Sequence, residues 1–368
     1  MRPHGLAAPT RLISALLLLL LAVAGPARAQ GLVREPIDIP ATYRTGEKAM
    51  LEALVVRPAG PGRFPLAVMT HGAPRDRGEV RRRTPQGLLA QATEFARRGW
   101  TTVVVMRRGY GASEGDAALE YNSCKTPAYE ASGRRGADDL REAIRFMGQQ
   151  PYVDARRVIG VGVSAGGLVA SALTADPPPG LVAAISFAGG RGSTADHTLC
   201  AEDALVDTFG VYGRTSRVPM LWVYAQNDRY FEPRVARRFH AAFTANGGRA
   251  AYVEVPPFGE DGHTLFTAGI PVWAPIIDRF LAENRLQPPP ARISQAPPPP
   301  ALGAAGRESY DKYLAAPPNK AFVASGEGAY GWRSGRRSED EARAEALDAC
   351  RKHAKQPCRV VNVNDRAE

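Results

Sequence analysis

The stretch from Arg157 to Leu173 constrains the fold more than any other part of the chain. A run of apolar, β-branched residues ends in the turn Gly162-Val163-Ser164-Ala165-Gly166, after which the residues favour a helix. A strand, a sharp turn with serine at its tip and a helix form the context of a nucleophile elbow. Glycines two residues before and after the serine remove Cβ atoms that would collide there. We therefore predict that Ser164 is a nucleophile; the alternative is a glycine-rich connection with an incidental serine.

Apolar strands alternate with amphipathic helices from residue 51 to residue 285. This alternation predicts an α/β fold, with a mainly parallel sheet covered by helices on both faces. The expected strands are 51–56, 64–70, 101–106, 158–163, 181–187, 220–224 and 251–255. The expected helices are 88–96, 137–147, 168–173, 235–243 and 273–281.

Two further polar residues follow strands of this predicted sheet. Asp228 comes after the strand that ends at Tyr224, and His263 follows the last strand in a glycine-flanked loop. The order Ser…Asp…His is that of α/β-hydrolases. His263 would take the proton of Ser164 and return it to the leaving group, while Asp228 would orient the imidazole.

Other residues compete for the role of the acid. Asp228 could instead form a turn with the preceding asparagine, and Asp261 is the main rival, although it lies very close to His263 in sequence. Asp203 and Asp207 are lesser rivals, in a long excursion over residues 189–216. That excursion, expected to hold a short helix, and the loop over residues 112–132 are predicted to cap the site.

The negative charge that develops on a substrate carbonyl oxygen needs backbone donors. One is expected to be the N–H of Ala165, which directly follows the nucleophile. The other is expected from the turn after the strand 64–70. We choose Ala73 in that turn, because Pro74 has no N–H to donate.

Taken together, residues 36–285 resemble the α/β-hydrolase superfamily, in particular its dienelactone-hydrolase-like and prolyl-oligopeptidase-like branches. The motifs that carry the resemblance are His71-Gly72, Arg108–Gly115, Gly162–Gly166, Asn227-Asp228 and Gly262-His263. The resemblance implies a Ser-His-Asp hydrolase that needs no metal and no organic cofactor. Dienelactone hydrolases proper use cysteine as the nucleophile, whereas Ser164 stands at that position here.

The first 29 residues have the features of a secretory signal peptide. Basic residues precede an apolar run from Ile13 to Ala24, and Ala27-Arg28-Ala29 supplies small residues before a cleavage point. The run is short for a membrane span, although an uncleaved anchor is the rival interpretation. We expect an exported protein, periplasmic or extracellular, with no stable membrane anchor after cleavage.

The chain contains four cysteines. In an exported protein an even number favours disulfides, and we predict the pairs Cys124–Cys200 and Cys350–Cys358. No cysteine or histidine pair has the spacing of a zinc site.

The C-terminal part of the chain is predicted to form a separate unit. Residues 287–308 are rich in proline and alanine and predict a semi-rigid linker that follows a hydrolase domain of residues 30–286. Residues 309–368 predict a small α+β module, in which Ser338 caps a helix and the Cys350–Cys358 bridge supplies a staple. This module resembles an uncharacterised one in exported bacterial proteins, and it could contact a protein or the cell envelope.

A net charge of +10 is spread along the chain, and no nucleic-acid-binding module is visible. The sequence therefore predicts an exported serine hydrolase that cleaves carboxylic esters, with a small-molecule ester or peptide as substrate and no nucleic-acid partner. The alternatives are a serine peptidase of the same fold and a non-catalytic envelope binding protein.

Overall fold

A computed structural model describes residues 1, 32–117, 124–288, 297–316, 319–364 and 366–368. Residues 2–29 of the predicted signal peptide, residues 118–123 of the predicted capping loop and part of the predicted linker lie outside these residues. In the described part of the chain, the main sheet has eight strands in the order β1-β2-β4-β3-β5-β6-β9-β10. Their bounds are β1 Leu32–Thr42, β2 Lys48–Pro58, β3 Phe64–Thr70, β4 Thr101–Val105, β5 Val153–Val163, β6 Leu181–Phe187, β9 Met220–Ala225 and β10 Ala250–Val255.

The sheet is parallel from β4 to β10, and β1 and β2 extend it in the antiparallel sense. This confirms the expected α/β-hydrolase architecture. Strand β1 was not expected, because Pro36 and Pro40 interrupt its sequence. It lies at the edge of the sheet, where a missing N–H on the outer side costs no ladder hydrogen bond.

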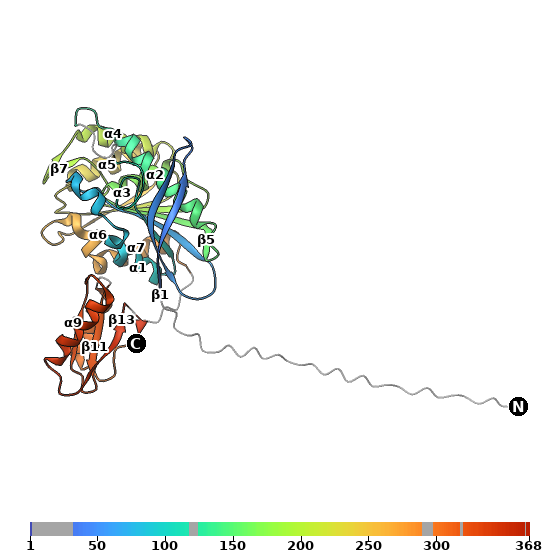
Figure 1. Cartoon of the computed structure of the whole chain (residues 1–368). Helices are drawn as coiled ribbons and strands as arrows, with labels where there is room; N and C mark the ends of the chain where they lie inside the picture. The colour runs from blue at the N-terminus through green and yellow to red at the C-terminus, as the bar shows by residue number, and fades with distance from the viewer. Residues whose placement is uncertain (2–31, 118–123, 289–296, 317–318, 365) are drawn as a thin grey trace.

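Helices cover both faces of the sheet (Figure 1). Helices α2, α3, α4 and α5 contribute to one apolar core, and α1, α6 and α7 contribute to the other. Their bounds are α1 Leu89–Arg97, α2 Tyr129–Met147, α3 Ala165–Ala175, α4 Glu202–Gly213, α5 Pro233–Ala245, α6 Leu265–Ala268 and α7 Ile270–Glu283. The excursion over residues 189–216 holds α4 and a small hairpin of β7 (Ser193–Ala195) and β8 (Thr198–Leu199).

Helix α2 begins at Tyr129, well before the start at residue 137 that the sequence indicated. Its first turns contain glycine, which is a poor helix former. The fold needs these glycines for close packing. A Cβ on Gly133 would lie 2.3 Å from the hydroxyl of Tyr212, and one on Gly136 would lie 2.5 Å from a methyl group of Val169. Tertiary contacts therefore override local propensity here.

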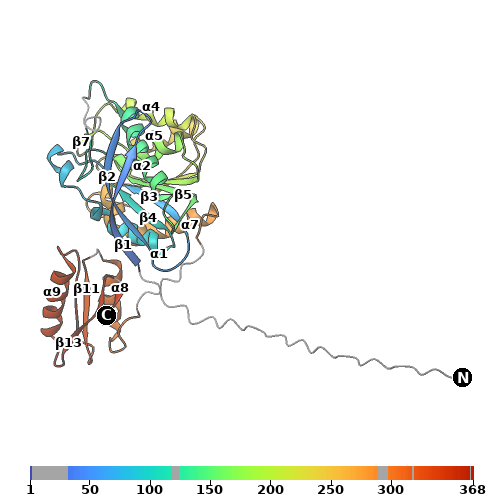
Figure 2. The ribbon, with the colours of Figure 1, turned by 45° about the vertical axis from the view of Figure 1, so that its right-hand side comes forward.

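The C-terminal module is an α+β unit, as expected (Figure 2). In its described residues an antiparallel sheet with strand order β12-β11-β13-β14 has apolar clusters on both faces, one with α8 and one with α9. The bounds are α8 Ala304–Ala315, β11 Ala321–Ser325, β12 Tyr330–Arg333, α9 Glu339–Arg351, β13 Cys358–Val363 and β14 Arg366–Ala367. Helix α8 was not expected and starts inside the segment 287–308 that we predicted as a linker.

Both predicted disulfides are present, Cys124–Cys200 and Cys350–Cys358. Stable disulfides are typical of proteins in an oxidising compartment. Among the described residues no single helix is long and apolar enough to cross a membrane. The pair Gly262–Ala268 and Ile270–Glu283 meets the length and composition criteria only when taken together, across a bend of 79°.

Candidate active site

Ser164 occupies the turn between β5 and α3 in a backbone conformation that is rare for a non-glycine residue. Its φ is 56° and its ψ is −121°. The flanking glycines are needed for this turn: a Cβ on Gly162 would lie 1.9 Å from the carbonyl oxygen of Gly166, and one on Gly166 would meet the carbonyl oxygen of Thr70 at 2.6 Å. A strained backbone at such a position is a common property of functional sites. The geometry is that of a nucleophile elbow.

Asp228 and His263, which follow β9 and β10, are hydrogen-bonded to each other. Nδ1 of His263 lies 3.0 Å from one carboxylate oxygen of Asp228 and 3.1 Å from the other. The Asp228 carboxylate is buried and also accepts the backbone N–H groups of Tyr230 and Phe231 at 2.8 and 2.9 Å. With Nδ1 committed to Asp228, the second ring nitrogen of His263 is left for a proton donor.

The rival carboxylates have other partners. Asp261 accepts the backbone N–H of His263 at 2.9 Å and that of Arg229 at 3.1 Å, so it shapes the loop that carries the histidine. Asp203 pairs with Arg238 at 2.6 Å on the exposed face of α4, and Asp207 is also exposed on that helix.

The turn after β3 packs directly against the elbow. A Cβ on Gly72 would lie 3.0 Å from the Cβ of Ser164. His71 holds this turn, since its Nδ1 donates to the carbonyl oxygen of Gly72 at 2.7 Å and its Nε2 accepts the N–H of Arg107 at 3.2 Å. Burial and the nearby Arg107 charge hold the pKa of His71 well below its ordinary value, so the ring is neutral. Its role here is structural.

A cavity of about 290 Å³ opens beside Ser164 and Ala165. Ala73 lines it as well, so both predicted donor residues lie at the same cavity as the serine. The N–H of Ala165 is in the first turn of α3, where it has no acceptor within the helix. A backbone donor in that position is suited to binding a developing oxyanion.

Described parts of the two predicted capping segments line this cavity and are linked to each other at its wall. Cys124, Pro127 and Ala128 come from the loop before α2, whereas residues 190–194 and Cys200 come from the excursion after β6. The Cys124–Cys200 disulfide covalently links them. Next to it, the hydroxyl of Tyr129 donates to the carbonyl oxygen of Cys200.

Sequence reasoning missed an aromatic and cationic stack on His263. The ring of Tyr230 lies parallel to the imidazole, with 3.9 Å between centroids and 8° between planes. The guanidinium of Arg75 covers the other face of Tyr230 at 3.6 Å from its centroid, and Asp196 pairs with Arg75 at 2.8 Å. The sequence offers no pattern for this stack beyond the closeness of Tyr230 to Asp228, because Arg75 and Asp196 lie far away along the chain.

The described charged residues that line the cavity are all arginines: Arg75, Arg77 and Arg191. Arg191 is buried and donates to the hydroxyl of Ser132 at 2.5 Å. Burial lowers its pKa to about 10, so the side chain remains cationic at neutral pH. In the part of the chain that the structure describes, no group of three or more His, Cys, Asp or Glu side chains could hold a metal ion.

Comparison with known proteins finds one protein family and many solved structures. The family model for X-Pro dipeptidyl-peptidase (S15 family) matches residues 47–229. A candidate dienelactone hydrolase from Klebsiella pneumoniae subsp. pneumoniae is 17% identical over 69% of this chain and 99% of its own, with a TM-score of 0.49. An esterase from Pyrococcus furiosus is 13% identical over 68% of this chain and 90% of its own, with a TM-score of 0.48.

An acylaminoacyl peptidase from Pyrococcus horikoshii is 15% identical over 68% of this chain and 42% of its own, with a TM-score of 0.49. Comparison with curated proteins gives no match. A fold alone does not specify a substrate.

Proposed function

We propose that this chain, whose main sheet has the strand order and direction expected of an α/β-hydrolase, is a serine hydrolase that cleaves carboxylic esters through an acyl-enzyme. The observation that carries the proposal is the strained turn at Ser164, which lines a cavity together with Tyr230. Tyr230 stacks on the imidazole of His263, which is hydrogen-bonded to the buried carboxylate of Asp228. A binding protein would need neither the strain nor the buried pair.

In the proposed reaction the oxygen of Ser164 attacks the ester carbonyl carbon while His263 accepts the serine proton. The resulting tetrahedral intermediate collapses, the bond to the alkoxy group breaks, and His263 gives the proton to the departing alcohol. Water then attacks the acyl-enzyme with His263 again as the base, which releases the acid and restores the serine. Asp228 keeps the imidazole in one tautomer and stabilises its protonated form.

The N–H groups of Ala165 and Ala73 are proposed as the donors to the carbonyl oxygen as it becomes negative. Both residues line the cavity next to Ser164. Removal of one such donor typically lowers kcat by about two to three orders of magnitude. Proline at position 73 would remove one donor while adding little bulk, so Ala73→Pro is expected to lower kcat within that range.

Ester cleavage is favoured over removal of dipeptides from peptide N-termini, although the matching family model describes X-Pro dipeptidyl-peptidases. A peptide with a free N-terminus brings an ammonium group into the site, which requires an acceptor or a carboxylate. The described charged residues at the cavity are Arg75, Arg77 and Arg191, and no described Asp or Glu lines it. Such a lining is better suited to neutral or acidic acyl groups.

Fluorophosphonate labelling of the mature protein tests the proposed nucleophile. We expect a label on Ser164 in the wild type and no label in Ser164→Ala, with a strongly reduced labelling rate in His263→Ala. The labelled peptide is identified by mass spectrometry. Folded wild-type protein that takes no label, before and after reduction of its disulfides, would favour the non-catalytic binding protein instead.

Paired substrates separate ester from peptide cleavage. A series of p-nitrophenyl esters of increasing acyl length is compared with Gly-Pro-p-nitroanilide, and Ser164→Ala serves as the blank. We expect turnover of the esters and little turnover of the anilide. A higher kcat/KM for the anilide would establish the peptidase alternative.

The proposal includes export to the periplasm or the extracellular space. It is supported by the two disulfides and by the signal-peptide pattern of residues 1–29. N-terminal sequencing of the secreted protein is expected to begin at Gln30. A mature protein that retains Met1 would contradict this part of the proposal.

A further inference from the structure

A second hollow lies in the C-terminal module. It is an open groove of about 1030 Å³, lined by the segment Glu327–Ser334 and by the end of α9. Strand β12 forms one wall, and within the described sheet of the module it is an edge strand that pairs with β11 on one side. The groove is therefore built along a sheet edge.

The register of the hairpin decides which backbone groups of β12 face outward. Ser325 donates its N–H to the carbonyl oxygen of Ala329 at 2.8 Å, and the N–H of Ala329 donates to the hydroxyl of Ser325 at 3.1 Å, so this pair is hydrogen-bonded across the hairpin. In an antiparallel ladder every second pair does so. Tyr330 and Trp332, which occupy the intervening positions, therefore direct their backbone N–H and C=O groups away from β11. Arg333 caps the Trp332 carbonyl at 2.8 Å, which leaves the other outward groups for a ligand.

The aromatic side chains of these same residues are turned away from the helix that borders the groove. Tyr330 stacks on Phe322 with 5.7 Å between ring centroids, and Trp332 packs near Tyr313 of α8. Both belong to the apolar cluster on the α8 face, whereas α9 covers the opposite face. The β12 wall thus offers mainly backbone rather than ring faces to a ligand.

The charged residues of the groove are predominantly basic. Those that line it are Arg333, Arg336, Lys352 and Lys355, together with a single acid, Glu327. Glu345 lies nearby and pairs with Arg336 at 2.7 Å, which offsets part of this charge. The side chains of Lys352 and Lys355 are exposed at the end of α9.

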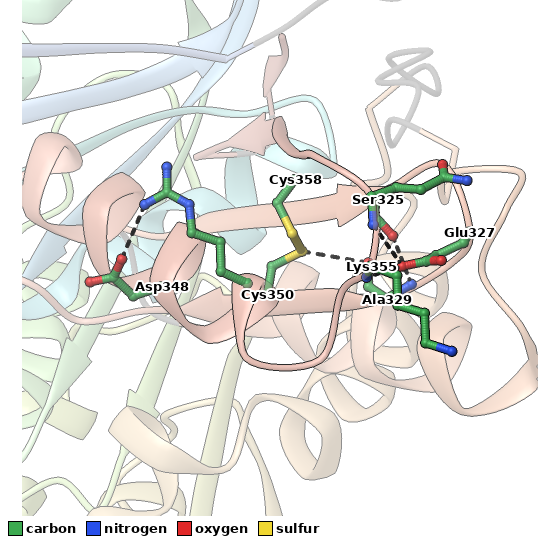
Figure 3. The surroundings of a disulfide bond; sticks show 9 residues. Ser325, Glu327, Ala329, Asp348, Cys350, Lys355 and Cys358 are labelled. Carbon is green, nitrogen blue, oxygen red and sulfur yellow. Dashed lines mark hydrogen bonds and ion pairs between the residues drawn. A yellow bond between two sulfur atoms is a disulfide. The ribbon is translucent and has the colours of Figure 1, made fainter.

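The frame of the groove is tied together around the disulfide (Figure 3). Glu327 accepts the backbone N–H of Lys355 and, at 3.0 Å, that of Gln356, so its carboxylate is committed to the loop after α9. The Cys350–Cys358 bond joins α9 to β13, and Cys350 lies against Ala329, with its Sγ 3.6 Å from the Ala329 carbonyl oxygen. The groove is held in place without a ligand.

We propose that this groove binds an extended, acidic peptide segment of a partner protein, which pairs with β12 as an additional strand. Outward backbone groups supply the pairing, as in other cases where a peptide extends an exposed sheet edge. Lys352 and Lys355 supply attraction for carboxylates. A second copy of this chain fits less well, because two such edges would bring like charges together. An acidic polysaccharide would gain little from the rings, which face α8.

Binding is tested with the full mature protein and an acetylated, amidated octapeptide of alternating Glu and Thr, by calorimetry at low and high salt. Two control peptides have the same length. One replaces Glu by Lys, and the other keeps Glu but has alternate backbone amides N-methylated. Oligogalacturonate of similar charge represents an acidic polysaccharide. We expect binding of the first peptide alone, weakened by salt because exposed charges are screened.

Reversing the charge of both Lys352 and Lys355 is expected to raise the dissociation constant of the acidic peptide by about tenfold, since each exposed charge pair contributes modestly to binding. The matched control, Lys312→Glu on α8, lies outside the groove and is expected to bind normally. Hydrogen exchange is expected to slow in the segment 326–334 when the peptide is bound. Ser164→Ala is expected to bind like the wild type, so the result is independent of the proposed hydrolase activity.

Three results would overturn the proposal. Equal binding of the N-methylated peptide would mean that charge alone is recognised, without strand pairing. Preferential binding of oligogalacturonate would identify the groove as a polysaccharide site. If hydrogen exchange shows that the module is folded and the acidic peptide still does not bind, β12 does not bind acidic peptides.

Discussion

At the scale of single residues, His263 is positioned by more than its carboxylate partner. Asp228 fixes its Nδ1, and the parallel ring of Tyr230 covers one face of the imidazole. The guanidinium of Arg75 lies over the ring of Tyr230 and forms an ion pair with Asp196. A small displacement of a catalytic base can cost a large factor in rate, so this stack bears on the proposed chemistry.

Replacing Tyr230 by leucine is therefore expected to lower kcat by about tenfold with little change in KM, because the ring orients the base without a direct role in the reaction. Tyr230→Phe keeps the stacked ring and is expected to restore most of the activity. Steady-state ester hydrolysis measures both. Equal losses in the two variants would mean that the hydroxyl, and not the stack, matters.

A second prediction concerns His71 and the pH dependence of the free energy of unfolding. Because the pKa of His71 is lowered in the folded protein, the imidazole binds a proton in the unfolded chain at pH values at which it stays neutral in the folded protein. Stability attributable to this group is therefore full above about pH 6.5 and declines as the pH falls below it, by up to about 1.4 kcal/mol per pH unit. Urea unfolding of the wild type and of His71→Asn between pH 7 and pH 5 tests this. The variant should have the shallower slope; identical slopes would contradict the prediction.

At the scale of elements, a buried ion pair ties the glycine-rich loop after β4 to helix α2. Asp139 accepts Nε of Arg108 at 2.7 Å, the Arg108 backbone N–H at 3.0 Å and the hydroxyl of Tyr43 at 2.8 Å. Both ionic side chains are nearly inaccessible to solvent, at 3% and 2% exposure. Arg108 also pairs with Glu47 at 2.8 Å, but the Glu47 side chain is partly exposed, whereas Asp139 is the counter-charge that is buried with Arg108.

Asp139→Asn is expected to lower the free energy of unfolding by about 3 kcal/mol, since it leaves the Arg108 charge buried with an incomplete counter-charge. The neighbouring Asp138 provides the control. Its pair with Arg141 is 42% exposed on the carboxylate side, so Asp138→Asn is expected to cost less than about 1 kcal/mol. Urea unfolding measures the free energy of unfolding of both variants. Equal values for the two would contradict this account.

The disulfides belong to the same scale and differ in what they connect. Cys124–Cys200 joins two segments that line the cavity at Ser164, whereas Cys350–Cys358 lies in the C-terminal module. Replacing both cysteines of the first pair by serine is expected to lower kcat/KM for esters by about tenfold, because the cavity walls lose their covalent link. The same change at the second pair should leave ester hydrolysis unaltered.

Near-ultraviolet circular dichroism at 25 °C should establish that both double variants are folded before rates are compared. The first pair spans 76 residues and the second spans 8, so loss of the first should also lower the melting temperature more. Unchanged ester hydrolysis in folded Cys124→Ser/Cys200→Ser protein would show that the link is not needed for the site.

At the scale of the whole molecule, the module and the hydrolase domain meet through polar contacts to backbone carbonyl groups. Arg34 of β1 donates to the carbonyl oxygen of Asn364 at 3.0 Å, and Arg97 of α1 donates to that of Leu314 at 3.0 Å. The apolar clusters of the module are separate from the two cores of the hydrolase domain. Each part therefore has an apolar core of its own.

Deletion of residues 304–368 is accordingly expected to leave kcat/KM for esters within about twofold of the full chain, and to abolish binding of the acidic peptide. Ester hydrolysis and calorimetry on the two proteins measure these outcomes. A large loss of activity in folded, truncated protein would mean that the module contributes to the site. If the truncated protein keeps the localisation and the partners of the full chain, the C-terminal module does not anchor the protein to a partner or to the cell envelope.

Sequence alone determined most of the sheet and the identity of the elbow, because these depend on local patterns. Strand β3 has the predicted bounds of residues 64–70, since an apolar run between turn residues has few alternatives. The glycines around Ser164 are likewise a local requirement of a tight turn. The disulfide pairs could be predicted because four cysteines in two regions leave few sensible combinations.

Only the tertiary structure decided which residues gather around Ser164 and how the ends of helices are set. The stack of Arg75, Tyr230 and His263 and the arginine lining of the cavity join residues that are distant along the chain, so no local pattern marks them. The early start of α2 depends on glycines whose value lies in the approach of other helices. The groove at β12 exists because the hairpin register turns its backbone outward. Local propensity fixes what a segment prefers, whereas packing between segments decides which preferences the protein keeps.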